Sequence, residues 1–300
     1  MTTAYASRRA RTLSTLPVRG LQYQLHAWGT PSADQPLLVM LHGWMDLGAS
    51  FQFLIDAMAT DRAVVALDWR GFGGTHCAST DSYWFPDYLG DLDAVLRGLS
   101  PDRPVDLLGH SMGANVAMVY AGVRPDRIQR LIALEGFGMP VTTPAQAPGR
   151  YARWLDELAT PVSLKPYADL PAVAERLCRT NPRLRADRAL WLAAQWSEPR
   201  ADGLHHLRAD AAHKRVNPVL YREEEATACW RAITAPTLWV EGAQTEVLRS
   251  HAGPDARARF QTRLAQVPTL QQVLLDDCGH MLHHDQPEAL AQHIDAFLAA

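Results

Sequence analysis

A serine between two glycines stands where a buried strand is expected to meet a helix. Gly109, Ser111 and Gly113 form a G-x-S-x-G pattern that follows the apolar run Val105–Leu108 and precedes a helical pattern over Met112–Ala121. In this strand–turn–helix context the serine hydroxyl is held on a tight turn, exposed at the carboxyl edge of a sheet. The two glycines let neighbouring backbone approach closely. The pattern therefore predicts Ser111 as a nucleophile.

A serine hydroxyl is a poor nucleophile at neutral pH and needs a base to accept its proton. His280 is preceded by Gly279 and follows the strand-like run Gln272–Leu275. A loop after a parallel strand opens at the same sheet edge as Ser111. We therefore predict that His280 is the base.

Two more histidines, His283 and His284, lie within one helical turn of His280. We expect them to be solvated loop residues. Because no carboxylate or cysteine accompanies them at metal-ligand spacing, we predict no metal, and the chemistry needs no other cofactor.

The loop after the first buried strand reads His42-Gly43-Trp44. In folds with this kind of serine turn, one oxyanion donor comes from this loop and the other from the residue after the nucleophile. We assign these donors to the backbone amides of Trp44 and Met112, since preorganised N–H groups stabilise a developing oxyanion. For His42 we expect a hydrogen-bonding role beneath the loop, and we keep it as a candidate pocket residue.

Strand-like and helix-like runs alternate along most of the chain, which is typical of a parallel sheet with crossover helices. The predicted strands are Leu21–Trp28, Leu37–Leu41, Ala63–Asp68, Val105–Leu108, Leu131–Leu134, Thr237–Val240 and Gln272–Leu275. The predicted helices between and after them are Phe51–Ala59, Tyr83–Leu99, Met112–Ala121, Asp255–Val267 and Pro287–Leu298.

Between roughly residues 140 and 231 the strand-like runs vanish and helical patterns punctuated by prolines take over. The patterns cover Arg150–Ala159, Pro171–Arg179, Asp187–Trp196 and Pro218–Trp230. We therefore divide the chain into a core formed by residues 1–139 and 232–300 and a helical cap or lid formed by residues 140–231.

With these motifs the chain resembles the α/β-hydrolase superfamily. The resemblance rests on His42-Gly43-Trp44, Asp68–Gly73, Gly109–Gly113 and Gly279-His280. It implies an α/β-hydrolase fold: a mostly parallel central sheet flanked by helices, with a helical cap inserted after the sixth family strand. More narrowly, the chain is similar to the serine-hydrolase-like branch near haloalkane dehalogenases and epoxide hydrolases. Those two enzyme classes use an aspartate where this chain has Ser111, so their activities are disfavoured.

The resemblance leaves two choices for the acid that orients the catalytic histidine. The family usually places it three residues beyond a glycine after the post-cap strand, but here Gly242 leads to Thr245, which cannot be an anion. Glu246 is one residue later. Glu135 ends the strand Leu131–Leu134, where some haloalkane dehalogenases carry their acid. We favour Glu135 and keep Glu246 as the alternative.

The cap is rich in large aromatic residues, most of which we expect to form its own core. Phe137 and Met139, at the cap hinge, and Trp44 are candidate pocket residues, since such pockets are mainly apolar. For His205, His206 and His213 we expect solvated cap positions. These features predict a serine hydrolase acting on a small to medium, largely apolar acyl substrate. A carboxylic ester is favoured, and thioesters, amides, lactones and C–C bonds stay open.

The composition of the chain argues against several kinds of partner and location. The formal net charge of −3 argues against a nucleic-acid partner, which needs a basic face. The apolar runs are too short for a membrane span, and no apolar region follows the arginines near the N-terminus, so we expect a cytoplasmic protein. The homo-oligomeric state stays open. Two rival functions remain: a lyase or cofactor-free oxygenase using Ser111 and His280 as acid and base, and a non-catalytic ligand-binding module.

Overall fold

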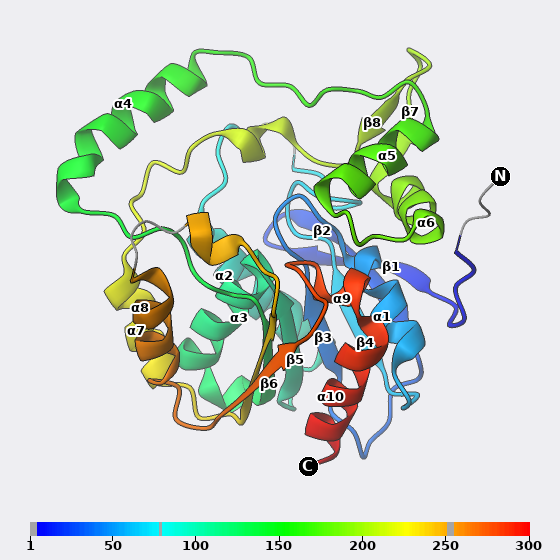
Figure 1. Ribbon diagram of the computed structural model, residues 1–300, viewed down its shortest axis with the longest axis vertical. Coiled ribbons are helices and arrows are strands. Elements are labelled where there is room, and N and C mark those ends of the chain that lie inside the picture. Colours follow the sequence, from blue (N-terminus) through cyan, green and yellow to red (C-terminus); the bar gives the residue numbers. More distant parts are fainter. Residues whose placement is uncertain (1–4, 78–79, 251–254) are drawn as a thin grey trace.

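A central sheet carries the molecule, and the computed structural model describes it over residues 5–77, 80–250 and 255–300 (Figure 1). The described residues form an eight-stranded sheet in the order β1-β2-β4-β3-β5-β6-β9-β10. Its strands are β1 (Thr12–Val18), β2 (Leu21–Trp28), β3 (Leu38–Leu41), β4 (Val64–Leu67), β5 (Val105–His110), β6 (Ile128–Leu134), β9 (Thr237–Gly242) and β10 (Leu270–Leu275).

The sheet is mostly parallel. Neighbouring strands from β4 to β10 in this order pair in parallel. Among the described strands of the sheet only β2 runs in the opposite direction, so its pairs with β1 and with β4 are antiparallel. This arrangement confirms the predicted fold class. The sequence did not predict β1, because this edge strand is mostly exposed and lacks the apolar run of a buried strand.

Helices cover both faces of the sheet (Figure 1). They are α1 (Gln52–Ala57), α2 (Phe85–Leu99), α3 (Met112–Val123), α7 (Glu223–Arg231), α8 (Ala256–Leu264), α9 (Leu282–Asp285) and α10 (Pro287–Ala299). Alternate residues of a strand face opposite sides. Val39 and Leu41 therefore join the core beneath α2 and α3, while Leu38 and Met40 join the core beneath α1 and α10.

A cap lies over the carboxyl ends of the parallel strands (Figure 1). It contains α4 (Ala147–Leu158), α5 (Leu170–Thr180) and α6 (Ala186–Trp196), together with an antiparallel hairpin of β7 (Ser197–Pro199) and β8 (His205–Leu207). The hairpin is a correction, because the sequence predicted helices alone in this range. Its three-residue strands are too short to give an alternating pattern.

The last helix of the predicted cap lies against the core instead. The pattern Pro218–Trp230 forms a helix only over α7, which packs against α3. Trp230 is 1% exposed and belongs to the core that α3 also joins. The last of the four helical patterns predicted for residues 140–231 therefore packs on the core rather than over the sheet edge. No helix in the described part of the chain is both long and apolar enough to cross a membrane.

Candidate active site

Ser111 occupies a strained turn between β5 and α3. Its φ of 52° and ψ of −114° lie in a region that non-glycine residues rarely adopt, which is a feature of functional sites. The Ser111 backbone N–H donates to Leu134 O at 2.8 Å, which fixes the turn to β6. The turn lifts the Ser111 side chain above the carboxyl end of β5.

The glycines on either side of Ser111 are required by close backbone contacts. A Cβ on Gly113 would lie 2.2 Å from Leu41 O, and a Cβ on Gly109 would lie 2.4 Å from Gly113 O. Both distances are far below van der Waals contact with rigid backbone. The G-x-S-x-G pattern therefore reflects packing of α3 against the neighbouring strand ends.

His280 lies between Ser111 and Glu135. Its Nε2 is 3.0 Å from Ser111 Oγ, and its Nδ1 is 2.6 Å from Glu135 Oε2. Because a carboxylate only accepts, Nδ1 carries the proton and Nε2 is free to accept the serine hydroxyl proton. This is the tautomer that a general base requires.

Glu135 is a buried carboxylate with three donors. It stands at the end of β6 with a φ of 54° and is 1% exposed. The Gly242 N–H donates to Oε1 at 2.8 Å, and the Thr245 hydroxyl donates to Oε2 at 2.7 Å. Together with His280 Nδ1–H these donors satisfy and orient the buried carboxylate. Thr245, at the position where the resemblance leads one to look for the acid, is therefore a donor to Glu135.

Glu135 and Glu246, the two alternative candidates for the acid, lie in different surroundings. The Glu135 carboxylate contacts His280, whereas the neighbouring Glu246 side chain is exposed. In the loop after β9, the residue that hydrogen-bonds to Glu135 is Thr245, one residue before Glu246.

The loop after β3 lies directly against Ser111. A Cβ on Gly43 would be 3.2 Å from Ser111 Cβ, so the backbone that leads into Trp44 passes beside the serine. The N–H of Met112 belongs to the first turn of α3, where backbone donors have no partner within the helix. Both predicted oxyanion donors are therefore backbone groups at the edge of the same site.

His42 is a structural residue rather than a pocket residue. It is fully buried, its Nε2 accepts the Trp69 N–H at 2.9 Å, and its Nδ1 donates to Gly43 O at 2.7 Å. Burial lowers the pKa of His42, which keeps the ring neutral. With both nitrogens occupied beneath the loop, His42 cannot contact a substrate.

The other candidate pocket residues differ in exposure. Phe137 is 2% exposed and packs against Trp239 and Phe260, so the structure places it mainly in the core. Met139 is 57% exposed and Trp44 is 54% exposed, so both side chains are available at the surface. The sequence pattern alone could not predict which of these three side chains would be buried.

His110 is a site residue that the sequence analysis missed. Its Nε2–H donates to the backbone carbonyl of His280 at 2.8 Å, which ties the serine turn to the histidine loop. Burial is the largest influence that lowers the pKa of His110 well below its ordinary value. The only sequence signal was its place as the residue before Ser111.

Three histidines expected to be solvated are corrected by the structure. His283 and His284 are 0% and 3% exposed, and burial lowers the pKa of His284 well below its usual value. His213 is 8% exposed and stacks between Phe72 and Tyr83, with ring centroids 3.8 and 3.6 Å away. Burial lowers the pKa of His213 to about 3. Their burial comes from partners distant in the sequence.

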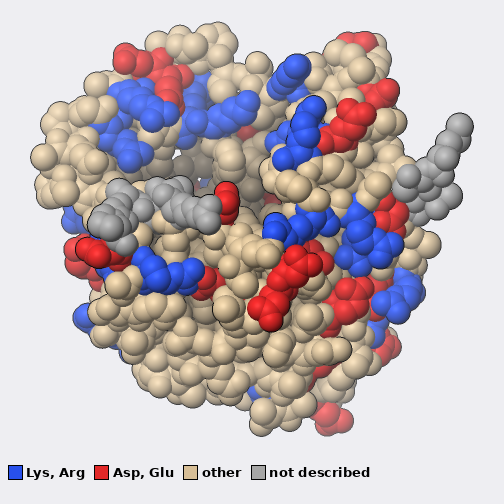
Figure 2. Space-filling view, in the orientation of Figure 1, with Lys and Arg blue, Asp and Glu red and all other residues tan. Residues whose placement is uncertain are grey.

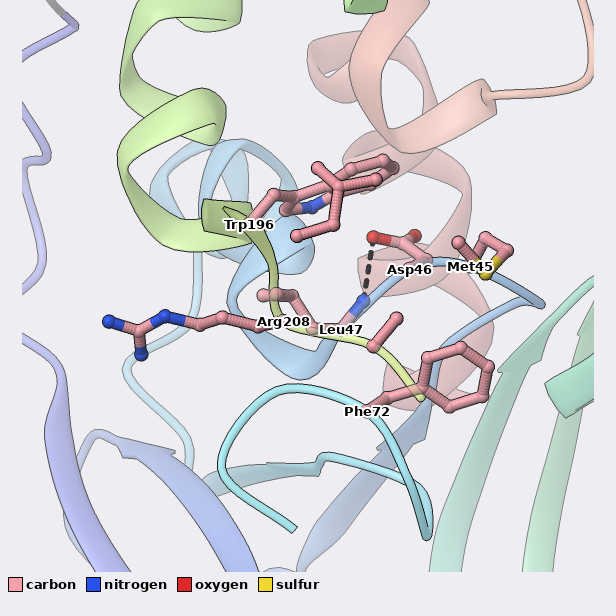
Figure 3. A pocket seen from close by; sticks show the side chains of 8 residues that line it. Met45, Asp46, Leu47, Phe72, Trp196 and Arg208 are labelled. Carbon is pink, nitrogen blue, oxygen red and sulfur yellow. Dashed lines mark hydrogen bonds between the residues drawn. The ribbon is translucent and has the colours of Figure 1, made fainter. Parts of the chain in front are cut away.

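The face of the molecule near the site is hollowed. Figure 2 shows a hollow between the part of the cap that carries α4 and the part that carries α5 and α6, with basic side chains on both sides. A narrower recess is lined by Met45, Asp46, Leu47, Phe72, Trp196, Leu207, Arg208 and Ala209 (Figure 3). The recess lies between the loop that follows Trp44 and the β8 end of the cap.

Comparisons with known proteins agree with this architecture. The family described as alpha/beta hydrolase fold matches residues 36–287, so the chain belongs to the α/β-hydrolase family. A serine hydrolase-like protein of Danio rerio is 33% identical over 137 residues, covering 45% of this chain and 41% of that protein. The chain thus spans less than half of that relative.

Two other relatives match over most of their length. The 2-(acetamidomethylene)succinate hydrolase of Mesorhizobium japonicum is 26% identical over 268 residues, covering 88% of each chain. The solved thioesterase domain from the curacin biosynthetic pathway is 28% identical with a TM-score of 0.82, covering 95% of this chain and 99% of that domain. The family and these relatives identify the chain as an α/β hydrolase.

Proposed function

We propose that this protein is a serine hydrolase that cleaves carboxylic esters of small to medium, largely apolar acyl groups through an acyl-enzyme. The observation that carries the proposal is the placement of His280, whose two ring nitrogens lie 3.0 Å from Ser111 Oγ and 2.6 Å from Glu135 Oε2. One ring can therefore accept the serine proton while a carboxylate stabilises the imidazolium that forms.

In the acylation half-reaction, Ser111 Oγ attacks the substrate carbonyl carbon and His280 Nε2 takes the hydroxyl proton. The carbonyl oxygen becomes an oxyanion that the amides of Trp44 and Met112 stabilise. His280 then gives its proton to the leaving alcohol as the C–O bond breaks. Ser111 is left as an ester of the acyl group.

In the deacylation half-reaction, a water loses a proton to His280 and attacks the acyl carbon. The bond to Ser111 Oγ breaks, the serine regains its proton from His280, and the carboxylic acid leaves. Glu135 stays ionised throughout and holds the imidazole in place.

The choice of an apolar acyl group rests on the side chains at the surface around the site. Trp44 and Met139 present exposed apolar side chains on the loop beside Ser111 and at the cap hinge. The similar proteins include a thioesterase domain and a 2-(acetamidomethylene)succinate hydrolase. Thioesters, and acyl groups that carry a free carboxylate, therefore belong in the substrate panel, the latter because basic side chains flank the hollow (Figure 2).

The test is covalent labelling of Ser111 with a fluorophosphonate, followed by intact mass. Wild type should gain one adduct, and folded Ser111→Ala should gain none. A panel of p-nitrophenyl esters and acyl thioesters of increasing length, with a hemisuccinate ester, then measures kcat/KM. Absence of an adduct on folded wild type would reject the hydrolase mechanism and favour the acid–base or binding-module rival.

A further inference from the structure

A second cluster of polar side chains is buried beneath the active site. Among the described residues, Asp46, His283 and His284 each offer one ligand atom, and these atoms all lie within 4.8 Å of one another. The three residues are 4%, 0% and 3% exposed. Asp46 comes from the loop after β3 and the histidines come from α9, so the tertiary structure joins the carboxylate and the imidazoles that the sequence keeps apart.

The cluster contains ligand atoms with no partner of their own. Within the described part of the chain, Asp46 Oδ2, both ring nitrogens of His283 and His284 Nε2 are buried without a hydrogen bond. Buried polar atoms are nearly always hydrogen-bonded, so several unpartnered atoms in one place require an explanation. His283 Nε2 faces Asp46 Oδ2 at 3.7 Å, which is too long for a hydrogen bond.

That spacing suits a shared metal ion. Two ligands at about 2.0–2.1 Å from a tetrahedral zinc ion lie about 3.3 Å apart, so the pair needs to close by only a few tenths of an ångström. The ligand atom of His284 lies within 4.8 Å of the other two and has to move closer by a larger amount. Neutral imidazole and carboxylate are ligands that zinc and neighbouring transition metals bind.

The other oxygen of Asp46 is already held. Its Oδ1 accepts the Leu47 N–H at 2.8 Å and the Ser50 hydroxyl, which orients the carboxylate and leaves Oδ2 for the histidines. Figure 3 shows Asp46 lining the recess beneath Trp196, with its bond to Leu47 dashed.

We propose that Asp46, His283 and His284 form a binding site for one divalent transition-metal ion of the zinc class. The ion ties the loop that carries Trp44 to the segment that carries His280. It neither touches the Ser111 nucleophile nor takes part in ester cleavage. Binding therefore stabilises the fold around the active site independently of the chemistry.

The test uses the full chain without a histidine tag, first stripped with a chelator that is then removed. Zinc is titrated calorimetrically, and the melting temperature is measured with and without the ion. Wild type should bind one zinc per chain and melt several degrees higher, since a ligand that binds only the folded state stabilises it. His284→Gln should lose both responses.

The matched control is His206→Gln, which removes a half-buried histidine outside the cluster that also pairs with a carboxylate, Asp202, at 2.7 Å. This variant should bind zinc as wild type does. Failure of wild type to bind one zinc would overturn the proposal, as would undiminished binding by folded His284→Gln or loss of binding in His206→Gln.

Diffraction from zinc-soaked wild-type crystals gives a readout that does not depend on how the variants fold. An anomalous peak at the zinc edge between Asp46, His283 and His284 supports the site. A peak elsewhere, or no peak, rejects it.

Discussion

The hydroxyl of Thr245 donates to Glu135 Oε2 at 2.7 Å, and this same carboxylate oxygen contacts His280. Thr245 stands where the resemblance to the family leads one to look for the acid. Here that position supplies a donor to the carboxylate that stands at the end of β6. The Thr245 hydroxyl and the His280 ring therefore share one oxygen of the same buried carboxylate.

We predict that Glu135→Gln lowers kcat by about 10⁴-fold, the size of effect seen when a triad carboxylate becomes an amide. The amide can donate to Nδ1 and so favours the wrong imidazole tautomer. Steady-state ester hydrolysis measures the effect, with circular dichroism to verify folding. Glu246→Gln is the control and should keep wild-type turnover. The reverse pattern would move the acid to Glu246.

We predict that Thr245→Val lowers kcat/KM by about tenfold or more, because a hydrogen bond to a charged group contributes about 1.5–3 kcal/mol. Valine keeps the shape but removes the donor to Glu135. Thr245→Ser restores the hydroxyl and should recover most of the activity. Equal activity of the valine and serine variants would remove Thr245 from the positioning of Glu135.

We predict that Gly113→Ala lowers the free energy of unfolding by about 1–3 kcal/mol and abolishes most activity. The added methyl group would lie 2.2 Å from Leu41 O, and overpacking of this kind displaces backbone. Gly149→Ala in α4 is the matched control, since nothing lies within 4 Å of its added Cβ. In a helix this change should stabilise by at most about 1 kcal/mol. Urea unfolding measures the stability of both variants. Equal stabilities of Gly113→Ala and Gly149→Ala would contradict the packing argument.

We predict that stability falls as the pH is lowered below about 6.5, the ordinary pKa of an unfolded histidine. Burial lowers the pKa of folded His213 to about 3, so the unfolded chain binds a proton that the folded protein does not. Between these two pKa values His213 contributes a loss of about 1.4 kcal/mol per pH unit.

Urea unfolding between pH 6 and 4.5, which lies between the two pKa values, measures this dependence. His213→Phe keeps a ring between Phe72 and Tyr83, whose centroids are 3.8 and 3.6 Å from that of His213. The variant should reduce the slope of stability against pH by about one proton. An unchanged slope would show that His213 does not carry the effect.

Local sequence patterns were sufficient to predict most of the fold. Mainly apolar runs of four to six residues predicted the parallel strands, because a strand buried on both faces has few polar residues. Their alternation with helical patterns predicted a parallel sheet, and the resemblance of the motifs to the superfamily implied the α/β-hydrolase fold, which is confirmed. The edge strand β1 and the hairpin β7–β8 escaped prediction, since strands that are exposed or very short impose little constraint on residue type.

The candidate site also has features that local sequence predicts and features that depend on the tertiary structure. The sequence by itself determined that Ser111 stands on a strand-to-helix turn and that His280 follows a later strand at the same sheet edge, because each motif lies within a few residues. Only the tertiary structure decided that Glu135 rather than Glu246 contacts His280, and that Asp46 meets His283 beneath the site. Such contacts depend on strand order, loop path and burial, which arise when distant segments pack together.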